Sequence, residues 1–240
     1  MKILITICAR GGSKGIPGKN IKDINGKSLI GYSIDLTKKI KEKFDVKVAL
    51  STDDEAIKEK AESFGLKTDY SRPDYLATDA AGKIDTIRDL LLYEESIADT
   101  KYDFILDLDV TSPLRTLEDV EKALNIILEN PDALNLFSVN PAARSPYFNM
   151  VEKNDEGFYS LVKTNPDGSV MTRQSAPKVY ELNASFYWYR RAFFDKGIKS
   201  AITDRSLIYE MNHICFDLDH PVDFLFMEYL LQNKRLDFEL

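Results

Sequence analysis

The chain opens with an apolar run, Ile3-Leu4-Ile5-Thr6-Ile7, followed at once by Cys8-Ala9-Arg10-Gly11-Gly12-Ser13-Lys14-Gly15-Ile16-Pro17-Gly18-Lys19-Asn20. The run predicts a buried strand, and the stretch after it predicts a loop at the end of that strand. Glycine tolerates positive φ, so successive backbone N–H groups of this loop can point into one concavity. Arg10, Lys14 and Lys19 add full positive charges to it. The stretch therefore predicts a binding loop for a polyphosphate.

Two well-known phosphate loops do not match this stretch. Gly18-Lys19 is preceded at the Walker spacing by Ser13 instead of glycine and is followed by Asn20 instead of serine or threonine. The dinucleotide pattern Gly-x-Gly-x-x-Gly is also absent from the loop. The simpler alternative is a surface loop that tolerates glycine, and the interleaved cations argue against it.

Composition narrows the class of protein. A chain of 240 residues with 44% hydrophobic and 30% charged residues is typical of one globular enzyme domain, 1–240. The net charge of −7 argues against a nucleic-acid partner. Two cysteines indicate buried thiols and not a disulfide framework. No apolar run reaches the ~20 residues of a membrane span and no signal core precedes Arg10, so we expect a cytoplasmic protein without a membrane partner.

Strand and helix patterns alternate along most of the chain, which predicts an α/β fold with a doubly wound, mostly parallel sheet and helices on both faces. Residues 140–180 break this rhythm and predict a projecting β-rich arm with a hairpin turn at 154–157. The expected strands are 2–8, 46–50, 66–70, 104–108, 134–139, 184–189 and 214–218, and the expected helices are 28–43, 54–64, 83–95, 116–130 and 221–233.

A second chemical feature is Phe216-Asp217-Leu218-Asp219. Residues two apart on a strand share a face, so both carboxylates could reach one divalent cation. The alternative is that Asp219 stabilises the start of the following helix, in which Pro221 fits the first turn.

Three further stretches carry polar groups that could bind a ligand. Asp109 follows an expected strand, and its alternative role is a cap at the strand end. Arg173 could bind a carboxylate bidentately, and its alternative is a surface cation. Ser51-Thr52-Asp53-Asp54 could either hold a ligand or cap the next helix.

These motifs, taken together, resemble those of the acylneuraminate cytidylyltransferases, the CMP-sialic acid synthetase family, which join a nine-carbon 2-keto sugar acid to CMP with CTP and a divalent metal. The stretch from Arg10 to Asn20 resembles the family's opening loop. Phe-Asp-Leu-Asp-x-x-x-Asp-Phe, beginning at Phe216, resembles its metal motif. Thr111-Ser112-Pro113-Leu114-Arg115 and Arg173-Gln174-x-x-Pro177, followed by Asn183 and Tyr187, resemble its other motifs.

The resemblance implies a nucleotide-diphospho-sugar transferase-like fold, a homodimer built through the arm, and a site that uses Mg²⁺ or Mn²⁺. The sugar's anomeric hydroxyl would attack the α-phosphorus of CTP and expel pyrophosphate. Candidates for the general base are Asp219 and a hydroxide on the metal. The implied site residues fall into four groups: catalytic Arg10, Lys14 and Asp219; nucleotide-binding Arg10, Gly11, Gly12, Ser13, Lys14, Lys19 and Asn20; substrate-binding Asp109, Arg173, Gln174, Asn183 and Tyr187; and metal-binding Asp217 and Asp219.

The chain departs from the family pattern at a few positions around the expected sugar pocket. Asp109 replaces a glutamine and could either bind a different sugar hydroxyl or share the metal. Gly82 and Lys83 replace serines, and Ala184 replaces a glycine. These departures leave the identity of the sugar acid open. Two other functions remain possible at this point: a metal-dependent glycosyltransferase that uses an Asp-x-Asp motif at Asp107, and a non-catalytic nucleotide-binding module.

Overall fold

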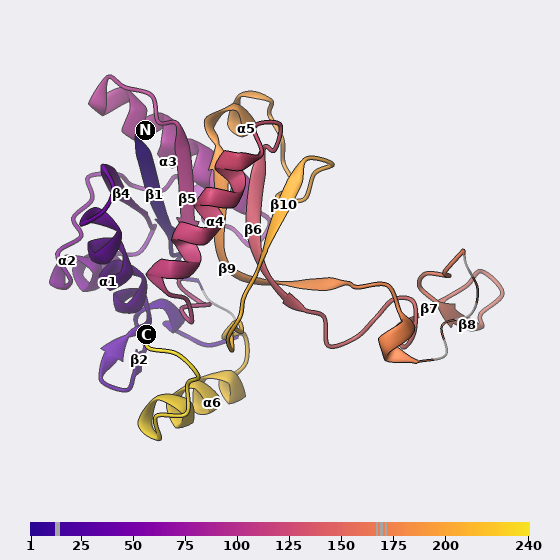
Figure 1. Cartoon of the computed structure of the whole chain (residues 1–240). Helices are drawn as coiled ribbons and strands as arrows, with labels where there is room; N and C mark the ends of the chain where they lie inside the picture. Colours follow the sequence, from indigo (N-terminus) through magenta and orange to yellow (C-terminus); the bar gives the residue numbers. More distant parts are fainter. Residues whose placement is uncertain (13–14, 167, 169, 171) are drawn as a thin grey trace. The chain divides into compact units, whose positions relative to one another are not determined.

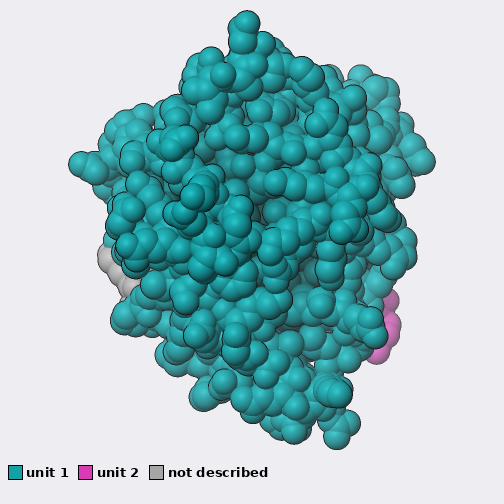
Figure 2. All heavy atoms as spheres, turned by 90° about the vertical axis from the view of Figure 1, so that its left-hand side faces the viewer, with its two compact units in different colours: residues 1–138, 183–240 teal, residues 139–182 magenta. Residues whose placement is uncertain are grey.

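The computed structural model describes residues 1–12, 15–166, 168, 170 and 172–240. The chain divides into two compact units, which Figure 2 colours separately. Unit 1 combines Met1–Ser138 with Asn183–Leu240, and unit 2 is Val139–Leu182. None of the helices in the described part of the chain is both long and apolar enough to span a bilayer.

Unit 1 is built on a six-stranded mixed sheet with the strand order β10-β6-β9-β5-β1-β4. In it β1 pairs in parallel with β4 and with β5, whereas β9 runs antiparallel to β5. The strands, some of which lie outside this sheet, are β1 (Ile3–Cys8), β2 (Asp23–Ile24), β3 (Lys27–Ser28), β4 (Val46–Ser51), β5 (Phe104–Leu108), β6 (Asn135–Pro141), β7 (Val151–Lys153), β8 (Tyr159–Leu161), β9 (Tyr180–Arg190) and β10 (Ser206–Glu210). The helices are η1 (Lys19–Ile21), α1 (Leu29–Lys41), α2 (Glu55–Ser63), η2 (Asp74–Leu76), α3 (Lys83–Ala98), α4 (Leu117–Glu129), η3 (Arg173–Ser175), α5 (Arg191–Asp195) and α6 (Pro221–Gln232).

The alternation of side chains along β1 divides the core into two layers. Ile3, Ile5 and Ile7 join the main apolar cluster, to which α1 and α4 contribute their buried faces. Thr6 points to the opposite face, where its hydroxyl donates to Asp107 of β5 at 2.8 Å. Helix α3 packs against β1 and β4, behind the sheet as drawn in Figure 1, whereas α4 lies in front. The expected doubly wound α/β architecture is confirmed.

Local signals explain where two of the helices begin. The Thr116 side chain accepts a hydrogen bond from the backbone N–H of Asp119 at 3.2 Å, and the Asp119 carboxylate accepts from the N–H of Thr116 at 2.7 Å. This capping box is the one expected from the sequence. Helix α6 begins with Pro221, and its N-cap is His220 instead of Asp219.

The prediction of a strand at 66–70 is wrong, and so is that at 214–218, because neither segment has regular secondary structure. The backbone N–H of Leu218 donates to the carbonyl of Thr111 at 2.9 Å, and the Ser112 hydroxyl donates to the carbonyl of Phe216 at 3.2 Å. The segment therefore binds the loop after β5 instead of a neighbouring strand. The edge of the sheet is formed by β10, which the sequence reading missed.

Unit 2 contains the hairpin of β7 and β8. Its turn closes where the N–H of Asn154 donates to the carbonyl of Phe158 at 2.8 Å and Gly157 takes a φ of +89°. The Asn154 side chain also accepts from the N–H of Phe158 at 2.8 Å. An asparagine and a glycine are thus used where the turn requires them, as the sequence predicts.

Candidate active site

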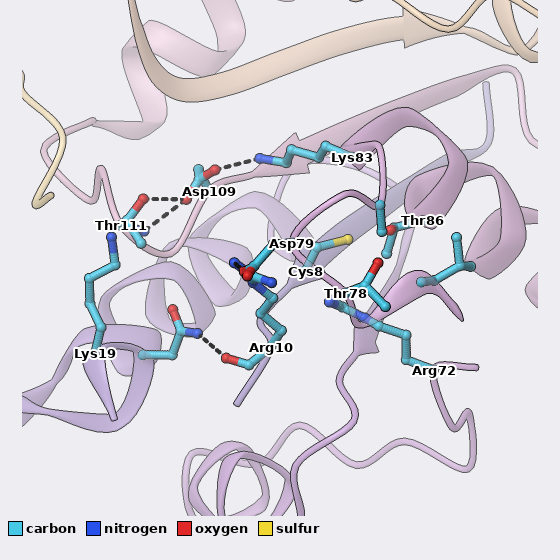
Figure 3. A pocket seen from close by; sticks show the side chains of 13 residues that line it. Cys8, Arg10, Lys19, Arg72, Thr78, Asp79, Lys83, Thr86, Asp109 and Thr111 are labelled. Atoms are coloured by element: carbon cyan, nitrogen blue, oxygen red, sulfur yellow. Dashed lines mark hydrogen bonds and ion pairs between the residues drawn. The ribbon is translucent and has the colours of Figure 1, made fainter. Parts of the chain in front are cut away.

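A cavity of about 290 Å³ opens in unit 1 beyond the carboxyl ends of β1 and β5 (Figure 3). Ligands of open α/β sheets bind at this edge. The lining is strongly polar and comes from the first loop, from the segment before α3 and from the residues after β5. Its members are Cys8, Arg10, Lys19, Asn20, Arg72, Leu76, Thr78, Asp79, Ala81, Lys83, Thr86, Asp109 and Thr111.

The first loop is held in shape by hydrogen bonds at both of its ends. The N–H of Ala9 donates to the carbonyl of Ser51 at 3.0 Å. The buried Asn20 donates through Nδ2 to the carbonyl of Arg10 at 2.9 Å, which ties the end of the loop to its beginning. Asn20, expected to contact the nucleoside, therefore also closes the loop. Ser13 and Lys14, predicted to bind the phosphates, lie outside the described residues.

Two of the loop's glycines are required by close neighbours. A Cβ on Gly11 would lie 2.9 Å from Cβ of Asp54, the residue that caps α2. A Cβ on Gly15 would lie 2.8 Å from the carbonyl oxygen of Asp219. Gly12, by contrast, has nothing within 4 Å of its hypothetical Cβ. The loop therefore approaches both α2 and the segment that carries the acidic pair more closely than any side chain would permit.

The hydrogen bonds of Asp53 and Asp54 show which of the two aspartates caps the following helix. Asp54 is the N-cap of α2, and its side chain accepts from the N–H of Ile57 at 3.2 Å. Asp53 accepts from the N–H of Gly11 at 3.2 Å. One aspartate thus caps the helix, and the other positions the glycine loop.

Both described cations of the loop are paired with carboxylates. Arg10 contacts Asp79 at 2.7 Å, and Lys19 contacts Asp219 at 3.3 Å. The Lys19 side chain is only 12% exposed, whereas that of Asp219 is 64% exposed. Each pair joins the loop to a separate segment of unit 1, and a bound phosphate would compete with these carboxylates for the same donors.

A lysine that the sequence marks only as a departure from the family pattern lines the cavity and contacts two carboxylates. Nζ of Lys83 lies 2.8 Å from Oδ2 of Asp107 and 2.5 Å from Oδ2 of Asp109. It also lies 5.4 Å from the centroid of the Tyr187 ring. The departures at Lys83 and Asp109, which are 26 residues apart, are therefore a single ion-paired contact.

Burial and the close opposite charges shift the pKa values of Lys83 and Asp109. Burial would lower the pKa of Lys83, but the neighbouring Asp107 and Asp109 raise it well above its usual value. Burial would raise the pKa of Asp109, but Lys83 and the hydrogen bonds from Thr111 lower it to about 2. Asp109 is therefore ionised at neutral pH, and its carboxylate can only accept hydrogen bonds.

The acidic pair after β10 has the character expected of a cation site. None of the described residues donates a hydrogen bond to Oδ1 of Asp217, although this atom is buried. Burial raises the pKa of Asp217, and the nearby Asp109 and Asp219 raise it further. A hard divalent cation would offset the repulsion between these carboxylates and would bind the oxygen that lacks a donor, so Asp217 and Asp219 fit Mg²⁺ or Mn²⁺. Within the described residues no three potential ligands gather closely enough to form a metal centre by themselves.

The four remaining substrate candidates are divided between the two units. Arg173 and Gln174 are exposed in unit 2, where Arg173 donates to the carbonyls of Ala142 and Ala143 at 3.2 and 2.7 Å. Asn183 is buried in unit 1 and accepts from the Ser138 hydroxyl at 2.6 Å.

Tyr187, the fourth candidate, is buried, and its ring lies beside Lys83 but is not among the described residues that line the cavity. Ala184 has a φ of +57°, a left-handed conformation that favours glycine. This conformation gives a physical reason for the glycine of the family pattern at that position.

Sequence reasoning missed residues whose role depends on partners far along the chain. Arg72 is buried and donates to the hydroxyl and the carbonyl of Ser51 at 2.9 and 2.7 Å, where it forms part of the cavity wall. Buried Arg115 donates to the carbonyl of Asp109 at 2.8 Å and to that of Ser185 at 2.7 Å. The signal that could have identified Arg72 and Arg115 is a charged residue within a motif of uncharged residues, because a buried charge needs hydrogen-bond partners in the fold.

Comparison with known proteins gives a consistent result. The sequence profile of the family described as Cytidylyltransferase matches residues 4–237. Post-translational flagellin modification protein B of Campylobacter coli is 38% identical over 235 residues, which cover 98% of this chain and 97% of that protein. CMP-N,N'-diacetyllegionaminic acid synthase of Campylobacter jejuni is 37% identical over 235 residues, with the same coverage. A solved structure titled CMP:2-keto-3-deoxy-manno-octonic acid synthetase complexed with CTP shares the fold, with a TM-score of 0.68 and 19% identity over 98% of this chain and all of that one.

Proposed function

Because this chain belongs to the cytidylyltransferase family, we propose that its sugar substrate is a nine-carbon 2-keto acid of the legionaminic, pseudaminic or sialic acid type. The chain is a nucleotidyltransferase of the acylneuraminate cytidylyltransferase family, and its reaction is the CTP-dependent activation of a 2-keto sugar acid to a CMP-sugar. The observation that carries the proposal is the cationic glycine loop at the end of β1, which opens on the same cavity as the ionised Asp109.

The proposed chemistry follows from these positions. The anomeric hydroxyl of the sugar acid attacks the α-phosphorus of CTP, the bond between that phosphorus and the β-phosphate bridge oxygen breaks, and pyrophosphate leaves. Such transfers depend mainly on positioning and on charge neutralisation. Arg10, Lys14 and Lys19 hold the triphosphate in this proposal, together with the N–H group of Gly12 and that of Gly11, which would exchange its bond to Asp53 for one to phosphate. Ser13 lies near the phosphates, and Asn20 contacts the nucleoside.

Asp217 and Asp219 would hold the divalent cation, which supplies charge neutralisation at the transferring phosphorus when it is bound. Lys19 lies 3.3 Å from Asp219 and so connects the phosphate loop to this acidic pair. Asp219 is exposed and is our candidate to accept the proton of the anomeric hydroxyl. Arg10 and Lys14 stabilise the charge that develops on the departing pyrophosphate.

The sugar acid would lie in the cavity beside Asp109 and would contact Tyr187, whose ring lies next to Lys83. Asn183 joins β9, which carries Tyr187, to β6 through the Ser138 hydroxyl. Arg173 and Gln174 belong to unit 2, and we propose that they contribute to sugar-acid binding, with Arg173 on the carboxylate.

Unit 2 is our candidate for the dimerisation arm. Its hairpin exposes several large apolar side chains, which is unusual for a surface that remains in water. They are Val151, Phe158, Tyr159 and Leu161. We therefore propose a homodimer formed through this unit, and replacing Phe158 with glutamate should convert it to a monomer in sedimentation analysis. A wild-type chain that sediments as a monomer would contradict this proposal.

The glycosyltransferase alternative is weakened by the triad. An Asp-x-Asp motif that binds a metal needs both carboxylates open to the ion. Asp107 is 0% exposed, and the ammonium of Lys83 already contacts both it and Asp109. The Lys83 ammonium therefore already occupies the position next to both carboxylates that a metal ion would need.

Pyrophosphate release tests the proposed function. The purified protein is incubated with CTP, Mg²⁺ and a panel of 2-keto sugar acids that begins with N,N'-diacetyllegionaminic acid, the acid in the name of the Campylobacter jejuni relative. The other three nucleoside triphosphates are the controls. Release with CTP and one nine-carbon acid is expected, whereas release only with an eight-carbon acid would contradict the proposed substrate class.

A further inference from the structure

The ion-paired triad of Lys83, Asp107 and Asp109 is the feature of the cavity that the proposed chemistry leaves unexplained. Lys83 is the first residue of α3, where a positive charge opposes the helix dipole. It is nevertheless held there by two carboxylates at 2.8 and 2.5 Å. The helix dipole disfavours the Lys83 ammonium at this position, and the residue lines a binding cavity, so its presence calls for a functional explanation.

The carboxylate of Asp109 is almost fully engaged. A carboxylate has about four acceptor positions, two on each oxygen. Oδ1 accepts from both the N–H and the hydroxyl of Thr111, at 2.9 and 2.8 Å. Oδ2 accepts from Lys83 at 2.5 Å. Among the hydrogen bonds of the described residues, one acceptor position is therefore left, on Oδ2.

The backbone of Asp109 is held just as firmly. Its N–H donates to the carbonyl of Ser185 at 3.1 Å. Its carbonyl accepts from Arg115 at 2.8 Å and from the Ser33 hydroxyl at 3.4 Å. The side chain is 19% exposed and forms part of the cavity wall (Figure 3). Asp109 thus cannot turn to present a different edge to a ligand.

Lys83 has little capacity left for a ligand of its own. Lys83 donates one hydrogen bond to Oδ2 of Asp109, its ammonium lies 2.8 Å from Oδ2 of Asp107 as an ion pair, and the ring of Tyr187 lies 5.4 Å away. Lys83 therefore acts through Asp109 and is a positioning residue.

We propose that Lys83 sets the specificity of the sugar-acid subsite by fixing Asp109 as an acceptor-only group with one free position. This inference rests on the proposed function and names a property of its substrate: the acid presents one amide N–H or hydroxyl donor to Oδ2 of Asp109. An acid that presents an acceptor at this point, such as an ester oxygen, is rejected because the two lone pairs repel and the carboxylate is left without a partner.

Lys83→Met tests the proposal, because methionine keeps the length of the side chain and removes the charge and the donors. Lys199→Met is the matched control, since Lys199 pairs with Asp85 of the same helix outside the triad. Binding of N,N'-diacetyllegionaminic acid is measured by calorimetry with a non-cleavable methylene analogue of CTP present. It is repeated with analogues that lack one donor each, either an ester in place of an amide or a deoxy group in place of a hydroxyl.

For the wild type and Lys199→Met, we expect one analogue to bind about 10- to 100-fold more weakly than the parent acid, the range for a hydrogen bond to a charged group. In Lys83→Met the parent acid and this analogue should bind with nearly equal affinity, while the affinity for the CTP analogue stays within a factor of about 2–3 of the wild-type value. An unchanged preference, or an equal loss of affinity for both ligands, would overturn the proposal.

Asp109→Asn provides a second variant in case Lys83→Met fails to fold, because it leaves Lys83 paired with the buried Asp107. It too should lose the preference, since an amide offers both a donor and an acceptor. A preference retained in Asp109→Asn would also overturn the proposal. Failure of the proposed function has a different signature: the wild type itself would bind none of the nine-carbon acids, before any substitution is made.

Discussion

Replacing Gly11 with alanine should destabilise the chain, although the sequence alone makes Gly11 and Gly12 appear equivalent. The φ angle of neither glycine lies in the left-handed region, so alanine is compatible with both backbones. The new Cβ at Gly11 would lie 2.9 Å from Cβ of Asp54 and 3.0 Å from its Cγ. These atoms are close to the backbone of the cap residue, so a simple side-chain rotation cannot remove the clash.

The expected loss in the free energy of unfolding follows from the hydrogen bond that must break to relieve the clash. Moving Asp54 breaks the cap on the N–H of Ile57, which is worth about 0.5–2 kcal/mol. Moving the loop instead breaks the hydrogen bond from Gly11 to Asp53, which is worth about 1 kcal/mol. Either route costs about 1–2 kcal/mol, which lowers the Tm by roughly 2–8 °C in a domain of this size.

The assay is thermal unfolding followed by circular dichroism, without nucleotide. Gly12→Ala is the control and should leave the Tm unchanged or slightly raised, because alanine restricts the unfolded chain. Gly11→Ala should cost almost nothing in an Asp54→Gly background, because glycine lacks the Cβ, Cγ and carboxylate oxygen of Asp54 that the new Cβ would meet. Equal Tm values for Gly11→Ala and Gly12→Ala, or strict additivity of Gly11→Ala with Asp54→Gly, would refute the reasoning.

Three other substitutions probe separate parts of unit 1. Ala184→Gly should stabilise the chain by up to about 1 kcal/mol, because relief of a left-handed alanine exceeds the added entropy of unfolded glycine; a lower Tm would contradict this. Burial would lower the pKa of His213, but the hydrogen bond to Asp119 at 2.8 Å raises it above its usual value. The stabilisation by His213 is thus complete below about pH 6.5 and is lost as the pH rises through the higher folded-state pKa. The difference in Tm between the wild type and His213→Gln should shrink over that rise, and a constant difference would exclude the linkage. Asp217→Asn should raise the Mg²⁺ concentration needed for half-maximal activity without lowering the Tm, whereas an unchanged titration would return Asp217 to a structural role.

Elements with strong local signals were predicted correctly from the sequence. The capping box of Thr116 and Asp119 satisfies the first N–H groups of α4 within four residues of chain, so no distant partner is needed. Pro221 begins α6 for a similarly local reason. The apolar run of β1 needs only to be buried, and its period-2 alternation divides the two layers of the core.

Elements that depend on a partner were harder to predict. Residues 206–210 form the edge strand β10 only because β6 offers an unpaired edge. Residues 214–218 carry equally suitable side chains, but their backbone groups are satisfied by Thr111 and Ser112. Strand propensity depends largely on such surroundings, so two similar apolar runs can end in different structures.

The sequence by itself determined the chemistry of the loop at Arg10, the alternation of strands and helices, and the acidic pair at Asp217 and Asp219. The tertiary structure alone decided which of these charges meet. Lys83, Asp107 and Asp109 show the difference most clearly, because the sequence draws attention to each of them but does not indicate that they contact one another. They become one triad since parallel packing of β1 and β5 brings the carboxyl ends of the strands to the start of α3. Charge interactions fall off steeply with distance and burial, and both quantities exist only once the chain has folded.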